Sequence, residues 1–432
     1  MSAPTTDRPA ATAPDEAAKP LAPISWKAPT GYGVFSVLSL VLFGLLPDSG
    51  RESTFTISTS KDFFQIDPIT VPSKSTAILL SLIALGLAVF SYVETKNRRK
   101  VGVWLPAIFG VCVVMAFLVW ADAGKDSPIP LTGLLQGSLF LAIPLVFGAL
   151  SGLLCERSGI INVAIEGQLL AGAFLAAVVA SITSSAYAGL IAAPIAGALV
   201  GALLVLFSIK YVVNQIIVGV VLNVLVIGVT SYLFSTVLKN DAARYNSPPK
   251  LPTIDIPVLS QIPVIGPVLF RQTVLVYVMY VVVALLQIFI FRSRWGLRLR
   301  AVGEHPKAAD TVGIKVNRTR MRSTILGSAV AGLGGAFFTV AAGLAFGKEM
   351  TGGKGFIALA AMILGRWNPV GALAAALLFG FSDNLQVVLG IVGTPIPSQI
   401  MLMTPYVVTI FAVAGLVGRV RPPASEGIPY VK

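Results

Sequence analysis

The strongest constraint on this chain is a series of apolar segments, each long enough to cross a lipid bilayer as a helix. Such a helix needs about 20 apolar residues to cross about 30 Å of hydrocarbon. Lipid cannot satisfy open backbone groups, and the strands of a membrane barrel would alternate in polarity, so helices are expected. The chain is therefore predicted to be all-α, a polytopic transmembrane helical bundle. The candidate spans are residues 32–47, 76–93, 101–121, 132–153, 168–184, 187–209, 215–237, 274–291, 323–346, 370–389 and 396–418.

The composition supports a membrane protein and excludes several other classes. Of 432 residues, 55% are hydrophobic and only 12% are charged, whereas a soluble domain carries about 25% charged residues. Two cysteines, Cys112 and Cys155, cannot make a disulfide framework or a thiolate metal site. His305 is the single histidine, which leaves almost no room for a histidine-based centre. We expect neither a metal nor a cofactor.

The basic residues predict how the chain is oriented. The net charge is +13, and the excess of Lys and Arg lies in short loops between spans, where the positive-inside rule places cytoplasmic segments. Residues 96–100, the loop 292–322 and residues 419–421 are therefore expected inside, and the loops 48–75 and 238–273 outside. No basic stripe is interleaved with exposed aromatics, so nucleic-acid binding is not expected.

This orientation makes both termini cytoplasmic and the number of crossings even. The shorter apolar run Phe356–Leu364 must then also cross, as a short or broken helix, which gives about twelve crossings, with ten as the alternative. Residues 1–30 are rich in Ala, Pro and Thr and predict a disordered cytoplasmic tail. We expect residues 31–121 to form an N-terminal extension of three spans, 122–420 a core, and 421–432 a second cytoplasmic tail.

Several motifs are absent from the sequence. No G-x-x-x-x-G-K-[ST] run occurs, so the chain is not expected to bind ATP through a phosphate-binding loop. There is no zinc-protease motif and no nucleophile elbow, and an enzyme is not predicted. Gly332–Gly335 and Gly197-x-x-x-Gly201 lie inside apolar spans, where small residues allow helices to approach closely.

The first informative polar segment is Cys155–Gln168, which places several polar residues between two spans and ends in Glu-Gly-Gln at the start of the next helix. An ionisable group in the bilayer costs about 2.5–3.5 kcal/mol even on the lenient insertion scale. Glu166 is therefore at the interface, paired, or lining water. The alternative is that Glu166 simply favours the positive end of a helix.

The second segment is the basic loop 295–314. Pro306 suits the first turn of a helix, Ala308 and Ala309 follow it, and Gly313 can stop it. A short helix on the membrane surface with small residues in its middle is a shape that another protein could bind. The alternative is a solvated loop whose charge only sets the topology.

The third segment is Gly355–Ala372, an apolar run that is too short to span comfortably and is bracketed by Gly and Asn-Pro. Interrupted apolar segments mark substrate sites in transporters, because unwound backbone is tolerated only beside a cavity or inside protein. Phe356 could stack on a flat substrate, although a lone aromatic more often serves packing. Asp383 and Asn384 lie within a later span, where a carboxylate should face the bundle interior.

Together, these segments resemble the permease subunits of the branched-chain amino acid, ribose and nucleoside class of ABC importers, and are most similar to the simple sugar and nucleoside permeases. An E-R-S-G-[IV]-I-N-x-x-x-E-G run matches Glu156–Gly167. A W-G-x-x-x-R-A-x-G-x-N-x-x-A-A-x-x-x-G-I loop matches 295–314, with His305 where the family usually has Asn. A G-F-I-A-L-A-x-x-x-x-G-x-W-[ND]-P-x-G run matches 355–371.

The resemblance implies a multi-pass permease of the bacterial cytoplasmic membrane, with residues 122–420 as the permease core, that moves nucleosides, with simple sugars such as ribose as the alternative. It implies a separate cytoplasmic ABC ATPase, a second related permease subunit and an extracytoplasmic substrate-binding protein as partners, besides membrane lipid. The family's ATPase dock carries over to Gly303, Glu304, His305, Ala308, Ala309, Gly313 and Ile314.

Neutral side chains would form hydrogen bonds with the polar groups of such a substrate, and an aromatic ring would stack on a nucleobase. The candidates for the substrate path are Asn162, Glu166, Asn223, Phe356, Asp383 and Asn384. A competing class is a secondary transporter coupled to an ion gradient through Asp383 or Glu166, which would need no ATPase. A third class is a membrane scaffold that does not transport.

Overall fold

A computed structural model describes residues 25–99, 101–102, 104–393, 400, 403 and 421–431. It is helical throughout its bulk, and ten helices in this described part are long and apolar enough to span a membrane. They match ten of the eleven predicted spans, while 396–418 apart from residues 400 and 403, and most of the predicted tail 1–30, lie outside the described residues. The first helix begins at Lys27, within the predicted tail.

The bounds of the long helices follow the apolar segments closely. Four of them are continued at their C-terminal ends by a π-helical turn, whose bounds stand in parentheses. The helices are α1 Lys27–Ser39 (Leu40–Leu45), α2 Ser73–Lys96, α3 Trp104–Ala121, α4 Leu131–Glu156, α5 Ile165–Thr183, α6 Ala186–Val205 (Leu206–Lys210), α7 Gln215–Leu233 (Phe234–Leu238), α9 Val274–Arg292, α12 Val316–Gly335 (Phe337–Ala341) and α14 Pro369–Val392.

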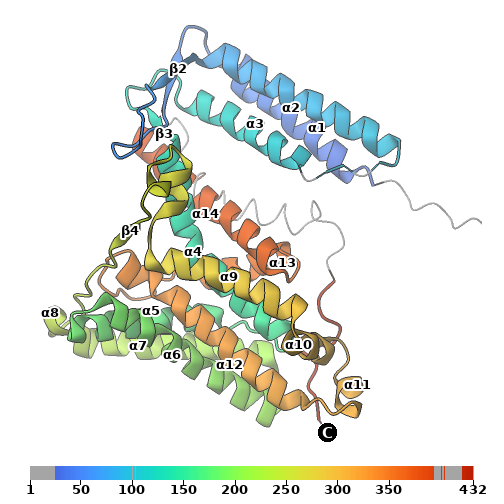
Figure 1. Cartoon of the computed structure of the whole chain (residues 1–432), viewed down its shortest axis with the longest axis vertical. Helices are drawn as coiled ribbons and strands as arrows, with labels where there is room; N and C mark the ends of the chain where they lie inside the picture. The colour runs from blue at the N-terminus through green and yellow to red at the C-terminus, as the bar shows by residue number, and fades with distance from the viewer. Residues whose placement is uncertain are drawn as a thin grey trace, which may run out of the picture.

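Helix α4 lies at the centre of the core, and α5, α12, α13 and α14 pack around it (Figure 1). Small residues allow α6 and α12 to approach each other closely. A Cβ added to Gly197 would lie 2.2 Å from the carbonyl oxygen of Ser328, and one added to Gly332 would lie 2.4 Å from that of Ala193. The sequence-based expectation that these glycines mark a helix–helix contact is confirmed.

The three N-terminal helices α1–α3 form a layer of their own beside the core (Figure 1). A three-stranded sheet of order β2-β1-β3 joins this layer to the start of α4. The central strand pairs antiparallel with β2 and parallel with β3. This sheet was not predicted from the sequence. Its strands are β1 Glu52–Thr56, β2 Ile69–Pro72 and β3 Ile129–Pro130.

Ion pairs between two loops strengthen this junction. The Lys61 ammonium lies 3.0 Å from Asp255, and the Arg271 guanidinium lies 3.9 Å from the buried Asp62 carboxylate. Asp255 and Arg271 belong to the antiparallel strands β4 Thr253–Asp255 and β5 Arg271–Thr273. The loops 48–75 and 238–273, both expected outside, therefore lie at the same end of the molecule.

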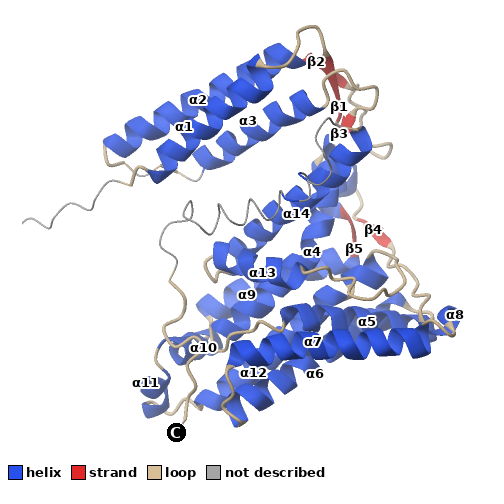
Figure 2. Ribbon diagram, turned by 180° about the vertical axis from the view of Figure 1, so that it is seen from behind, coloured by secondary structure: helices blue, strands red, loops and turns tan. Residues whose placement is uncertain are grey.

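The opposite end carries the short helices α10 and α11 and the C-terminal residues (Figure 2). A further short helix, α13, has 11 residues. At about 1.5 Å per residue it reaches only about half of the hydrocarbon thickness. A twelfth crossing and the cytoplasmic placement of the termini stay predictions. The short helices are α8 Ala242–Tyr245, α10 Arg294–Glu304, α11 Pro306–Thr311 and α13 Lys354–Leu364, with a 3₁₀ turn at Leu259–Gln261 and a π turn at Gly266–Phe270.

Candidate functional site

The loop between α4 and α5 is held by a buried polar network. The side chains of Asn162 and Gln168 exchange two hydrogen bonds of 3.0 Å, and the Asn162 amide also donates to the Ser151 hydroxyl at 3.2 Å. All three residues have no exposed surface. Since buried polar groups are costly unless paired, this network fixes the position from which α5 starts.

Helix α7 contributes a second anchor to the same loop. The Asn223 side-chain oxygen accepts from the Gly167 backbone N–H at 2.8 Å, and its amide donates to the Val163 carbonyl at 2.9 Å. The first backbone N–H groups of a helix have no partner within the helix. Asn223 therefore satisfies a free donor at the start of α5, although it lies 56 residues further along the chain.

Glu166, in the first turn of α5, caps a different helix. Its carboxylate accepts from the Thr351 hydroxyl at 2.6 Å and from the backbone N–H groups of Gly353 at 2.9 Å and Gly355 at 2.6 Å. These groups lie at the N-terminus of α13, where the helix dipole favours a negative charge. Glu166 is 6% exposed, and of the three alternatives left open by the sequence, the structure shows its carboxylate paired by hydrogen bonds.

This capping depends on two glycines. Gly353 precedes α13 with a left-handed φ of 80°, which a residue without a side chain adopts readily. A Cβ added to Gly355 would lie 2.5 Å from both the backbone nitrogen and the Cα of Glu166. Only glycine therefore allows the start of α13 to lie directly against the start of α5.

Two charged residues meet beside the start of α13. The Lys354 ammonium pairs with the Asp383 carboxylate from α14, and their side chains are 25% and 14% exposed. The neighbouring Asn384 donates to the Leu134 carbonyl at 2.7 Å. Asp383 does face the bundle interior. Sequence reasoning missed its partner Lys354, although a basic residue at the start of an interrupted apolar segment was a signal.

The six predicted path residues differ in how far they are exposed and in their partners. Asn162, Glu166, Asn223 and Asn384 are buried and engaged with backbone or amide partners. Asp383 is paired, and Phe356 alone of the six has a largely exposed side chain, at 50%. The structure brings Glu166 to the N-terminus of the helix that carries Phe356. Asn162 and Asn223 bond to the residues that follow Glu166, namely Gln168 and Gly167.

The turn between α13 and α14 joins the first polar segment to the third. Arg366 and Trp367 both have left-handed φ angles, 56° and 50°, which are strained for residues with side chains. The Trp367 indole N–H donates to the Glu156 carboxylate at 2.6 Å, and the Arg157 guanidinium donates twice to the Trp367 carbonyl at 3.1 and 2.9 Å. These bonds hold the turn against the end of α4.

The basic loop also contacts this junction. A Cβ on Gly303 would lie 2.3 Å from the Arg157 carbonyl oxygen, so the end of α10 packs directly against the end of α4. Helix α11 then begins at Pro306 and ends before Gly313, whose φ is 83°. The short helix predicted from these two residues is confirmed.

The predicted docking residues are not all on the surface. Glu304, His305, Ala308 and Gly313 are exposed, and Ile314 is partly exposed. Ala309 is only 4% exposed and packs against Val302 and Val316. Ala309 supports α11 from inside, as Gly303 supports α10, and the docking role of the seven residues stays a prediction.

A cationic groove runs beside α11. It has a volume of about 760 Å³ and lies between α10 and the first turns of α12. Apolar side chains such as Leu297 and Val312 border it, and none of its lining residues is acidic. Its basic side chains are Arg294, Arg298, Lys315, Arg318 and Arg322.

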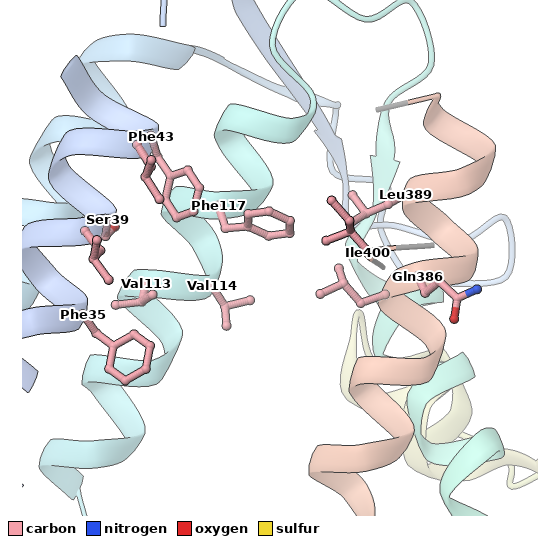
Figure 3. A pocket seen from close by; sticks show the side chains of 12 residues that line it. Phe35, Ser39, Phe43, Val113, Val114, Phe117, Gln386, Leu389 and Ile400 are labelled. Carbon is pink, nitrogen blue, oxygen red and sulfur yellow. The ribbon is translucent and has the colours of Figure 1, made fainter. Parts of the chain in front are cut away.

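A second cavity lies between the N-terminal layer and α14 (Figure 3). Its volume is about 450 Å³, and its lining is aromatic and aliphatic except for Ser39 and Gln386. The Ser39 hydroxyl is already bonded to Ser81 at 2.8 Å. A substrate rich in hydroxyl groups would find few partners here, so this cavity is not assigned to the substrate path.

Comparison with known proteins places this chain in a family. The family model described as the branched-chain amino acid transport system / permease component matches residues 134–413, which include all three polar segments. The chain belongs to this permease family. The match begins in α4, so α1–α3 precede the matched region.

Individual relatives of this permease are matched over nearly their whole lengths. The guanosine ABC transporter permease protein NupQ of Bacillus subtilis (strain 168) is 35% identical over 69% of this chain and 96% of the relative. The nucleoside ABC transporter permease protein NupC of Lactococcus lactis subsp. cremoris (strain MG1363) is 37% identical over 68% and 95%. The putative glucose ABC transporter permease protein TsgC13 of Haloferax volcanii is 30% identical over 64% and 89%. No solved structure matches the chain significantly.

Proposed function

We propose that this permease moves nucleosides across the bacterial cytoplasmic membrane as a subunit of an ABC importer driven by a separate ATPase. The observation that carries the proposal is its similarity, at 35–37% identity, to permeases named for guanosine and nucleosides over 95–96% of their lengths. The permease itself would hold no ATP site. Its partners would be the ATPase, an extracytoplasmic binding protein and a second permease, since it is also 26% identical to NupP of Bacillus subtilis.

The charges around α13 support an uncharged substrate. Glu166 compensates the positive end of the α13 dipole, and Asp383 compensates Lys354. This neutralised helix start offers no net positive charge that would attract a phosphate group. Nucleosides and simple sugars are neutral, whereas nucleotides are not.

The exposed ring of Phe356 favours a substrate that carries a nucleobase over a simple sugar. Its ring is 50% exposed in the second position after Lys354, on the helix whose position Glu166 fixes. A flat base can stack on such a ring, a contact worth about 1–3 kcal/mol per base in single-stranded nucleic-acid binding. A sugar ring has no comparable π-face. In this proposal Phe356 lines the path and Glu166, Asn162 and Asn223 position it.

Competition during uptake tests the substrate. Cells expressing the complete transporter are given labelled guanosine, with unlabelled nucleosides, ribose or glucose as competitors. We expect nucleosides to compete and sugars to fail, and we expect Phe356→Leu to raise the KM about tenfold, as loss of about 1.4 kcal/mol would. Phe356→Tyr, which keeps the ring, serves as the control. Competition by ribose or glucose alone would transfer the assignment to sugars.

A further inference from the structure

The C-terminal residues are bound to the protein instead of forming a free tail. Residues 421–431, which we name the C-terminal strap, lie at the end of the molecule that carries α10 and α11 (Figure 2). Pro423 and Ser425 are buried, with Ser425 only 8% exposed. The sequence predicts only a cytoplasmic tail for this segment, and nothing in its composition indicates a bound conformation.

Backbone hydrogen bonds attach the strap to two other segments at once. The Ser425 N–H donates to the Gly303 carbonyl of α10 at 2.9 Å, and the Gly427 N–H donates to the Gly159 carbonyl of the α4–α5 loop at 3.2 Å. The strap therefore bridges the end of α10 and the loop that leads into α5. Such backbone bonds specify the strap's path without depending on particular side chains.

Side chains reinforce both attachments. The Ser425 hydroxyl donates to the Glu304 carbonyl at 2.9 Å, and the Ala424 N–H donates to the Glu304 carboxylate at 3.3 Å. From α12, Arg320 donates to the Ile428 carbonyl at 2.8 Å. Arg320 is 1% exposed, so the strap supplies an acceptor to a buried charge that needs one.

Tyr430 completes a small apolar core beneath the predicted dock. Its ring packs against the cluster of Val302, Ala309 and Val316, which come from α10, α11 and the start of α12. The Tyr430 hydroxyl also interacts with Asp310 of α11. A six-residue helix has too few internal bonds to be stable alone, so α11 depends on such contacts.

Glu426 extends the connection towards the α13–α14 turn. Its carboxyl group faces that of Glu156, the residue that also accepts from the Trp367 indole. Burial raises the pKa of Glu426. The strap thus contacts the dock on one side and the residue that holds the strained turn on the other.

We propose that the C-terminal strap is a coupling element that holds α11 in the shape the ATPase binds and ties it to the α4–α5 loop and the α13–α14 turn. This inference rests on the proposed function, since it assigns the strap's role to the partner ATPase. A change in the ATPase at α11 would pass through Gly303 and Ser425 to Gly159, and through Glu426 to Glu156.

The test uses the purified full-length permease in lipid nanodiscs, alone and with its ATPase. The variants are a chain ending at Arg421, Tyr430→Ala, and Val431→Ala as the matched control, because Val431 is 70% exposed. Tyr430→Ala keeps the test valid if the shortened chain does not fold. Hydrogen exchange of residues 303–314 is measured without ATPase, and ATPase affinity and substrate-stimulated ATP hydrolysis are measured with it.

We expect the shortened chain and Tyr430→Ala to exchange about tenfold faster at 303–314, which corresponds to about 1.4 kcal/mol, and to bind the ATPase about tenfold more weakly. Val431→Ala should behave as wild type. Unchanged exchange in both strap variants would overturn the proposal, and so would faster exchange with unchanged ATPase affinity and stimulation. If the wild-type permease bound no ATPase, the proposed function would fail, while the exchange data would still show whether the strap holds α11.

Discussion

Replacement of Glu166 by glutamine separates a positioning role from direct contact with substrate. The carboxylate accepts three hydrogen bonds, from Thr351, Gly353 and Gly355. A glutamine side chain keeps one acceptor oxygen for Thr351 and Gly353, but its NH₂ group then faces the Gly355 N–H. The variant therefore loses at least one bond to a charged acceptor, together with the favourable interaction between the carboxylate and the α13 dipole.

The expected cost follows from these two losses. A hydrogen bond to a charged group contributes about 1.5–3 kcal/mol, and a charge at a helix terminus about 0.3–2 kcal/mol. We expect the start of α13 to lose about 3 kcal/mol of local stability, which is about a hundredfold in the opening equilibrium. Hydrogen exchange reports this directly, because the amides of Gly353 and Gly355 are themselves the donors.

The assay combines hydrogen exchange with uptake kinetics. In Glu166→Gln we expect faster exchange at 353–357 and a lower maximal uptake rate with little change in KM. Glu349→Gln is the matched control, since Glu349 is exposed in the loop before α13. If Glu166→Gln raised KM and left the exchange unchanged, Glu166 would be a substrate ligand and the capping argument would be wrong.

Three further perturbations test other parts of the structure. Gly355→Ala should abolish uptake, because the added Cβ would lie 2.5 Å from Glu166 backbone atoms; transport assays and size-exclusion profiles check this. Burial raises the pKa of Asp122 to about 6, above its ordinary value, so the folded state binds the extra proton and the apparent Tm should rise as the pH falls from 7 to 5. Ala308→Arg should weaken ATPase co-purification by bulk and charge at an exposed position of α11, without affecting membrane insertion.

Each of these perturbations has a control and an outcome that contradicts it. Gly347→Ala adds a Cβ into open space and should transport normally; normal transport by Gly355→Ala would refute the close approach. Asp122→Asn should flatten the dependence of Tm on pH, and a wild-type Tm that falls towards pH 5 would contradict the burial argument. Asn97→Arg adds the same charge at an exposed position outside α11, and equal ATPase binding by both arginine variants would remove Ala308 from the dock.

The long helices could be predicted because lipid leaves the backbone few choices. Ten spans followed from apolar length alone, and α11 followed from Pro306 and Gly313, whose backbone preferences mark a helix start and stop. The three polar segments were recognised as special because polar and ionisable residues between or within spans are expensive. Their convergence at one junction was not predicted.

The contacts that build the site could not be predicted from local sequence. Glu166 caps a helix 187 to 189 residues away, and no local pattern indicates which helix end a carboxylate will meet. The sequence also could not show that Ala308 is exposed and Ala309 is buried, because this depends on the positions of Val302 and Val316. The same limit applies to the pairing of β1 with β3, which joins two polar segments separated by the apolar helices α2 and α3.

The separation of the transport path from its energy source is the central claim, and uptake without ATP tests it most directly. Labelled guanosine uptake is followed in cells depleted of ATP while the proton and sodium gradients are held by an imposed potential, pH difference and sodium concentration difference. The proposed ABC permease predicts that uptake stops when ATP is lost and returns when ATP is restored. Uptake that continues without ATP and collapses only with the gradients would contradict it and would identify an ion-coupled transporter.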